Sequence, residues 1–142
     1  MSHLVVLDAA AFDTIESVEG RRLRGYLETA IARGGDFRCA AVTLAEVCRG
    51  VERTRRVESA LRRRHGGRRI TVVPTDERLA KRVGAILHGT GSGSERLADA
   101  HVVALCADGD LAVVFTSDPG DIRELAAAIP GTRVVTRRPS LR

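Results

Sequence analysis

Five short apolar runs recur along the chain, and segments with helical spacing separate them. The runs are uninterrupted enough to be covered on both faces, as the strands of parallel sheets are. Alternating strands and helices favour an α/β fold with a mainly parallel sheet, because parallel neighbours need a crossover between them. The predicted strands span residues 3–7, 37–42, 70–74, 111–116 and 133–136.

The segments between these runs place apolar residues on one helical face, which predicts helices that pack on the sheet. Leu23, Leu27 and Ala30 show this spacing in the first long segment. The glycine-rich stretch GTGSGS at residues 89–94 predicts a loop. The predicted helices span residues 20–33, 43–64, 76–88 and 94–107.

Length and composition indicate one globular domain. The chain has 142 residues, of which 44 % are hydrophobic and 29 % are charged. We expect residues 1–136 to form the domain and the basic RRPSLR at residues 137–142 to form a short tail. No apolar run approaches the roughly 20 residues of a membrane-spanning helix, so no membrane role is indicated. The N-terminus has no secretory signal and the three cysteines lack CxxC spacing, which predicts a cytoplasmic protein with reduced thiols.

The basic residues are unusual, because 22 of the 23 are arginines and the formal net charge is +5. A GC-rich coding sequence would explain this bias, and so would a partner rich in phosphate, for which guanidinium groups are well suited. Charge alone does not choose between the two. The arginines are densest in CRGVERTRRVESALRRRHGGRR at residues 48–69.

Two carboxylates follow predicted strands. Asp8 ends the apolar run in LVVLDAA, where a bare charge is costly unless it is paired, capped or bound. It could cap a short helix over AAAF, although strand-end carboxylates in α/β proteins often serve function. Asp118 in TSDPGD could likewise cap a helix that starts at Pro119, with Asp121 near the positive end of the helix dipole. Both explanations stay open for each residue.

Two further carboxylates lie on predicted helices. Glu46 follows Thr43 by three residues, which is the spacing of a capping box. Asp99 in LADAHVVALC is expected inside a helix that Ser92 and Glu95 would already cap. Aspartate is unfavourable inside helices, and the apolar neighbours offer Asp99 no compensation. Asp99 therefore predicts a bound cation.

Together these acids are more informative than each one alone. Side chains at strand ends and helix starts can converge at one edge of a parallel sheet, where ligands of α/β proteins bind. Four carboxylates repel one another, so protonation is favoured unless a divalent ion neutralises them. Ligation by oxygen alone suits Mg²⁺ or Mn²⁺ better than zinc. The sequence therefore predicts such a metal site, which usually acts on phosphates.

The order of the acidic motifs resembles the PIN domain, and specifically the VapC-type toxins of bacterial toxin-antitoxin pairs. The resemblance spans nearly the whole chain and rests on VVLDAAAF, TLAEVCRG, LADAHVVALC and VVFTSDPGDIREL. It implies a three-layer α/β/α domain that cleaves RNA as a metal-dependent endoribonuclease. It also implies a VapB-type antitoxin that holds the toxin inactive, and a homodimer.

The resemblance also implies roles for individual residues. Asp8, Asp99 and Asp118 would be metal ligands, and Glu46 would complete the catalytic pocket and position a water. Thr116 and Asp121 would lie just beyond the direct ligands. The sequence departs from the family at Ala10, where many members have a serine, threonine or asparagine. An alanine cannot supply the supporting hydrogen bond of such a residue, which puts metal affinity in question.

The implied reaction is metal-assisted hydrolysis of a phosphodiester, with one or two ions orienting the phosphate and activating water. Arg49, Arg53 and Arg56 follow Glu46 closely and are the candidates for RNA contacts, against the alternative of a solvated helix face. Few aromatic residues are available for base stacking, which favours recognition by RNA shape, as in a folded tRNA or rRNA.

Other classes of protein fit less well. A haloacid-dehalogenase-type phosphatase needs a second aspartate where Ala10 stands, and a P-loop protein needs a lysine that GTGSGSER lacks. The remaining alternative is a catalytically weak or inactive PIN-like module that binds RNA or protein, with the acids acting as helix caps. Metal binding distinguishes this module from the nuclease.

Overall fold

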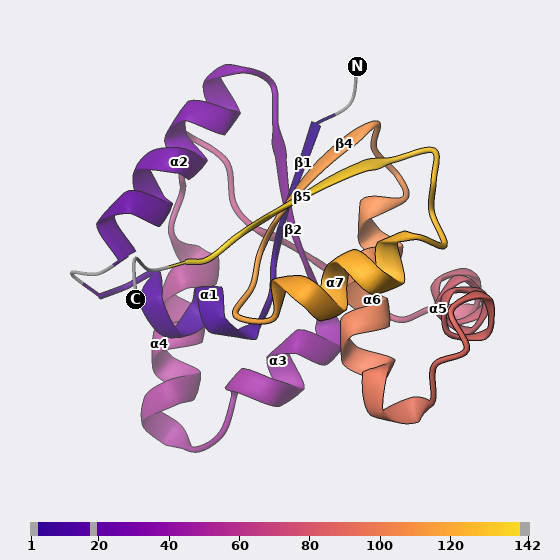
Figure 1. Cartoon of the computed structure of the whole chain (residues 1–142). Coiled ribbons are helices and arrows are strands. Elements are labelled where there is room, and N and C mark those ends of the chain that lie inside the picture. Colours follow the sequence, from indigo (N-terminus) through magenta and orange to yellow (C-terminus); the bar gives the residue numbers. More distant parts are fainter. Residues whose placement is uncertain (1–2, 18–19, 140–142) are drawn as a thin grey trace.

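A five-stranded parallel sheet forms the centre of the molecule (Figure 1). The structure is a computed structural model and describes residues 3–17 and 20–139. The strand order is β3-β2-β1-β4-β5, and every neighbouring pair is parallel. The strands are β1 (His3–Leu7), β2 (Asp36–Ala40), β3 (Thr71–Val73), β4 (Leu111–Phe115) and β5 (Arg133–Arg137).

Helices cover both faces of this sheet and complete three layers (Figure 1). One layer holds α1 (Ala9–Thr14), α2 (Arg21–Ala32) and α4 (Val51–Arg62). The other holds α5 (Glu77–Gly89), α6 (Leu97–Cys106) and α7 (Pro119–Ala126). The short α3 (Ala41–Val47) leaves the end of β2, and a 3-10 turn, η2 (Ser94–Arg96), precedes α6. The predicted α/β fold with a parallel sheet is confirmed.

The uninterrupted apolar character of β1 follows from burial on both faces. Leu4 and Val6 belong to the core under α5, α6 and α7, whereas Val5 and Leu7 belong to the core under α1, α2 and α4. None of the four exposes more than 4 % of its surface. A strand in this position has no solvent face, so an alternating pattern would be unfavourable.

The sequence prediction of one helix over residues 43–64 is wrong. The chain forms α3 and α4 instead, and Gly50 between them has a φ of +87°. This left-handed conformation suits glycine, so the break lies where a β-carbon would be strained. The second predicted strand is also too long, because the chain turns into α3 directly after Ala40.

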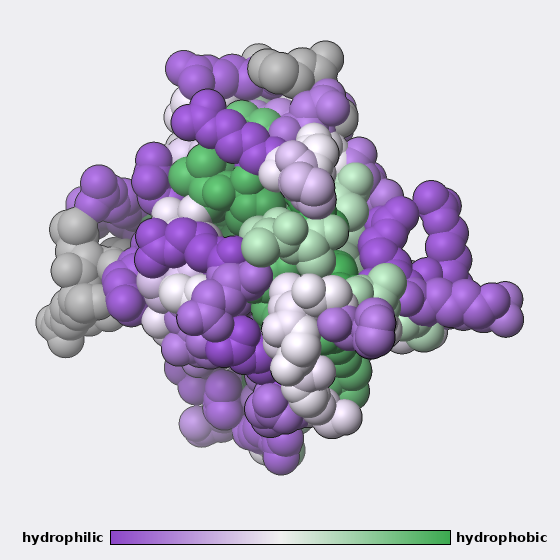
Figure 2. Space-filling view, turned by 45° about the vertical axis from the view of Figure 1, so that its right-hand side comes forward, coloured by the Kyte–Doolittle hydropathy of each residue, from purple (hydrophilic) through white to green (hydrophobic). Residues whose placement is uncertain are grey.

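The last strand ends at Arg137, one residue beyond the predicted domain boundary at 136. Residues 140–142 of the predicted tail lie outside the described residues. No helix in the described part of the chain is long and apolar enough to span a membrane. In Figure 2 hydrophilic residues cover most of one face, around a group of hydrophobic residues near its centre.

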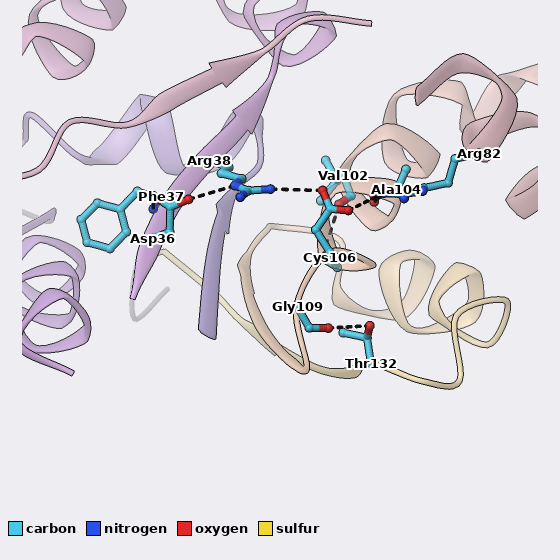
Figure 3. Close-up of polar contacts among 10 residues, drawn as sticks. Asp36, Phe37, Arg38, Arg82, Val102, Ala104, Cys106, Gly109 and Thr132 are labelled. Atoms are coloured by element: carbon cyan, nitrogen blue, oxygen red, sulfur yellow. Dashed lines mark hydrogen bonds and ion pairs between the residues drawn. The ribbon is translucent and has the colours of Figure 1, made fainter. Parts of the chain in front are cut away.

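The amino-end edge of the sheet carries a network of ion pairs (Figure 3). Arg38 of β2 donates to Asp36 at 3.0 Å and to Asp108 at 3.1 Å, and Asp108 follows the end of α6. Arg82 of α5 donates to the other carboxylate oxygen of Asp108 at 2.9 Å and to the carbonyl of Ala104 at 3.2 Å. The carboxylates of Asp36 and Asp108 are thus ion-paired within the protein.

Candidate active site

Three neighbouring strands place acidic residues at the opposite, carboxyl-end edge of the sheet. Asp8 follows β1, and Asp118 comes shortly after β4, which is the direct neighbour of β1. On the other side of β1, strand β2 leads into α3, which carries Glu46. Asp99 is on α6, which packs against β1 and β2. The topology therefore gathers residues that are far apart in the sequence.

Asp8 is buried and held by both of its carboxylate oxygens. Only 7 % of the residue is exposed. The backbone N–H of Ala9 donates to Oδ1 at 2.8 Å, so Asp8 caps α1 as one of the two interpretations predicted. The hydroxyl of Thr116 donates to Oδ2 at 2.7 Å. Each oxygen retains further acceptor capacity, so the contacts fix the carboxylate without using up its ability to bind a cation.

Thr116 links this carboxylate to the start of α7. Its hydroxyl oxygen accepts a hydrogen bond of 3.0 Å from the backbone N–H of Asp118, while the same hydroxyl donates its hydrogen bond to Asp8. Asp118 occupies the N-cap position with Pro119 as the first helical residue, as predicted. Its side chain, however, makes no capping hydrogen bond within the described structure. The carboxylate of Asp118 is exposed and remains available to a ligand.

Glu46 does not belong to a capping box. The N-cap of α3 is Ala40, so Thr43 lies inside the helix, fully buried, and Glu46 is an exposed residue of its last turn. Partial desolvation of its carboxyl group is the largest cause that raises the pKa of Glu46, although the residue as a whole is exposed, and the charge of Asp8 adds to it. Arg49 acts in the opposite direction and lowers it in part. Glu46 thus lies within electrostatic reach of the acidic edge.

Asp99 lies in the first turn of α6 rather than in the helix interior. The α-helix begins at Leu97, after the turn η2, and the Ser92–Glu95 cap predicted for it does not form. The side chain of Ser92 contacts Thr90 instead, and Glu95 accepts from the backbone of Gly93. A carboxylate in the first turn is compatible with the helix dipole, so helix propensity alone is a weaker argument for a cation than the sequence suggested.

The electrostatic surroundings of Asp99 favour a bound cation more strongly than its helix position does. Burial is the largest cause that raises the pKa of Asp99 from 3.8 to about 6. The other causes are all negative charges, which come from Asp8, Asp121, Asp118 and Glu46. The structure therefore brings together every acidic residue predicted for the site, and each one disfavours the ionised form of Asp99.

A basic residue of η2 contacts this acidic group. Arg96 donates to Glu124 at 2.7 Å and lies 3.4 Å from Asp121. Sequence reasoning missed Arg96, although its position three residues before Asp99 was a usable signal, since such neighbours share a helix face. Its ion pairs lie on the α7 side of the site.

Comparison with known proteins gives the family. Residues 5–128 match the PIN domain family. The chain belongs to this family. A chain in the crystal structure of VapBC2 from Rickettsia felis, bound to a DNA fragment from its promoter, has a similar fold with a TM-score of 0.64. The match covers 94 % of this chain and 98 % of that one, at 13 % sequence identity, which shows the shared fold alone. No curated protein matches the sequence.

The acidic edge of this PIN domain has the donor chemistry for Mg²⁺ or Mn²⁺. All of its donors are carboxylate oxygens, and their mutual repulsion would be relieved by a divalent cation. Among the described residues, no three His, Cys, Asp or Glu side chains are arranged as a ready metal site. The carboxylates of Asp118 and Glu46 are both exposed, so the acidic edge is accessible to a cation from solution.

The arginines that were predicted to contact RNA lie differently within the PIN domain. Arg49 donates to the carbonyl of Ala45 at 3.0 Å and lies near Glu46. Arg53 forms a 3.1 Å ion pair with Asp13 of α1, so its charge is already partly neutralised. Arg56 is exposed on α4. Of the three, Arg49 is the one associated with the acidic edge.

Proposed function

We propose that this PIN domain is a Mg²⁺- or Mn²⁺-dependent endoribonuclease that acts in the cytoplasm as the toxin of a VapBC-type pair. The observation that carries the proposal is the convergence of carboxylates on Asp99 at the carboxyl-end edge of the sheet. PIN domains are generally nucleases, and the similar fold found in VapBC2 supports a VapB-type antitoxin as partner. The proposal includes RNA as substrate, with tRNA or rRNA favoured, and a homodimer.

In this function Asp8, Asp99 and Asp118 hold the metal ion. When bound, the ion would supply a positive charge that orients the scissile phosphate and lowers the pKa of a water. The protein's own part is positional, because Thr116 and Ala9 hold the two oxygens of Asp8 in place. Without a cation the acidic edge would repel the phosphates of RNA, so a need for the metal follows from the charge of these residues.

The remaining residues shape the reaction around this centre. Glu46 is exposed, so its carboxylate can accept a hydrogen bond from a water and orient it for in-line attack. Asp121 lies beyond the direct ligands, where it is already paired with Arg96. Arg49 beside Glu46 would attract the RNA backbone.

Metal titration together with RNA cleavage tests this function. Calorimetry with Mn²⁺ on the wild type, Asp99→Asn and Asp108→Asn would be run beside cleavage of total RNA. We expect the wild type and Asp108→Asn to bind Mn²⁺ and cleave, and Asp99→Asn to do neither. Asp108 is the matched control because it lies at the opposite edge of the sheet.

A different result would favour the alternative function. If the wild type binds no metal and cleaves no RNA, the chain is a PIN-like binding module, and Ala10 is the first residue to restore. Ala10→Ser or Ala10→Asn would then be expected to recover metal binding, because a hydroxyl or amide there could support Asp8.

A further inference from the structure

A second concave site lies beside the acidic edge, and the proposed function does not use it. It is a cavity of about 350 Å³ between α2 and the end of β5, within the size range of small-ligand sites. Figure 1 shows the end of β5 running toward the start of α2, and residues from both elements line the cavity.

The wall of this cavity is aromatic. Tyr26 of α2 and Phe115 of β4 both line it, and their rings meet edge to face at a centroid distance of 5.2 Å. Tyr26 is half-buried, so part of its ring is accessible, whereas only 4 % of Phe115 is exposed. The chain has just four aromatic residues of the Phe and Tyr types, and two of them meet here. A flat apolar group can stack against such a wall.

The rim of the cavity is cationic. Arg22, Arg137 and Arg138 line it, and all three are exposed. Across the described residues none of the three forms an ion pair, in contrast to Arg53 and Arg96. Arg138 donates to the carbonyl of Ser117 at 3.0 Å, and this neutral acceptor orients its guanidinium group without forming an ion pair. Guanidinium groups at a site rim are suited to phosphate oxygens.

Two residues connect the cavity with the candidate active site. Arg138 also lines a second cavity of about 350 Å³ together with Asp118 and Asp121. Phe115 directly precedes Thr116, and its carbonyl accepts a 3.0 Å hydrogen bond from the backbone N–H of Asp8. Arg138 thus lines both the cavity beside Tyr26 and the one beside Asp118.

We propose that this aromatic and cationic cavity binds one nucleotide of single-stranded RNA next to the scissile phosphate. The base stacks on Tyr26, and Arg22 and Arg137 hold the adjacent phosphates. A paired base offers no free face to an aromatic wall, so the site selects single strands or unpaired loops. This inference rests on the proposed ribonuclease function for its substrate, and it adds a stacking contact to the recognition by RNA shape that the sequence favours.

The chain offers matched variants for a binding test. Arg22→Ala/Arg137→Ala removes two rim charges, and Arg21→Ala/Arg133→Ala removes two exposed arginines from the same helix and strand that do not line the cavity. The net charge is identical in both. The probe is a fluorescent ten-nucleotide single-stranded RNA of random sequence, measured by anisotropy in EDTA so that no metal-dependent cleavage occurs. Circular dichroism confirms that each variant is folded.

We expect the rim variant to bind the probe about tenfold or more weakly than the wild type, and the matched variant to change by less than about twofold. The slope of log affinity against log salt should fall by about 0.7 for each phosphate that the rim variant no longer neutralises. Tyr26→Leu should weaken binding about fivefold or more, whereas Tyr26→Phe should retain it. The same probe in duplex form should not respond to Tyr26.

Equal losses in the two double variants would overturn the inference, as would single-strand binding that ignores Tyr26. That result would leave a protein segment as the alternative occupant of the cavity. A wild type that cleaves RNA with Mn²⁺ while both double variants bind alike rejects only the nucleotide site. A wild type that binds the probe through the rim residues without ever cleaving it supports the nucleotide site and rejects the nuclease function.

Discussion

The two edges of the sheet carry the same kind of side chain in opposite electrical surroundings. At the amino-end edge, Asp36 and Asp108 form ion pairs of 2.9 to 3.1 Å with Arg38 and Arg82. At the carboxyl-end edge, Asp99 is surrounded mainly by other carboxylates, and its pKa is raised to about 6. The chain has 22 arginines. The excess of carboxylates over cations at this edge therefore does not result from a shortage of basic residues.

This difference separates structural acids from functional ones. When an acid is ion-paired within the protein, a neighbouring cation balances its charge, and the pair contributes modestly to stability. A cluster of acids that repel one another lowers the stability of the folded protein. Such destabilising clusters are typical of functional sites that bind a ligand. Substitutions at the two edges should therefore have different effects on activity and opposite effects on stability.

The largest effect is expected from the carboxyl-end acids. Asp99→Asn and Asp8→Asn each remove one charge from the metal site, so RNA cleavage with Mg²⁺ should fall at least about 100-fold, beyond the loss typical of supporting residues. Asp108→Asn should remain within about twofold of the wild type, because its partners lie at the other edge. Single-turnover cleavage rates measure both. Full activity in either site variant would remove the distinction between the edges.

A smaller loss is expected when the support of Asp8 is removed. Thr116→Val keeps the shape of the side chain but deletes the donor to Asp8 and the acceptor for the N–H of Asp118. Metal affinity should fall about 10- to 100-fold, as for other residues that orient a ligand. Thr116→Ser retains the hydroxyl and should stay near the wild type in a calorimetric Mn²⁺ titration. If valine and serine behave alike, the hydroxyl does not support the site.

The sequence was sufficient to locate the strands and the acids but not the local geometry between them. Uninterrupted apolar runs located the buried strands, because burial on both faces leaves no alternation, as Leu4 to Leu7 show. The acids could be located because carboxylates at strand ends are few and the parallel topology brings them together. The break at Gly50 was missed, since a glycine within a helical pattern is often tolerated and its positive φ is not visible in the sequence.

The roles of arginines were the least predictable part. Arg53 was a candidate for RNA, yet it pairs with Asp13, which is 40 residues away in the sequence. Arg96 and Arg138 reach the site only through the turn before α6 and the end of β5. The partner of a long side chain depends on which residues lie near it in the tertiary structure. The spacing of residues along one helix or strand does not predict those neighbours.

In the metal-free protein, ionisation of Asp99 should lower the free energy of unfolding, whereas ionisation of most aspartates raises it. Its pKa in the folded state, about 6, lies above the ordinary 3.8, so the wild type loses stability as the pH rises from about 4 to 6. Asp99→Asn lacks this loss and should be more stable at pH 7.5 in EDTA by about 1 kcal/mol, a value reduced for screening by solvent. Thermal unfolding should show this as an increase of about 3 °C.

Added Mn²⁺ should reverse that order, because only the wild type would gain stability from binding the ion. A wild type and variant that keep the same difference with and without Mn²⁺ would contradict the metal site. At pH 4 in EDTA the two proteins should be nearly equal, since Asp99 is then largely protonated in the folded state.

The smallest effect, with the opposite sign, is expected at the amino-end edge. Asp108→Asn loses the charge that Arg38 and Arg82 share, while an asparagine oxygen can still accept one hydrogen bond. These ion pairs are partly exposed, so the free energy of unfolding should fall by only about 0.5 kcal/mol in urea at low salt. The loss should shrink in 1 M NaCl, because salt screens exposed pairs. If Asp108→Asn instead stabilised the protein as Asp99→Asn is expected to do, acid repulsion would be a property of the whole molecule rather than of one edge, and the raised pKa of Asp99 would no longer distinguish a site.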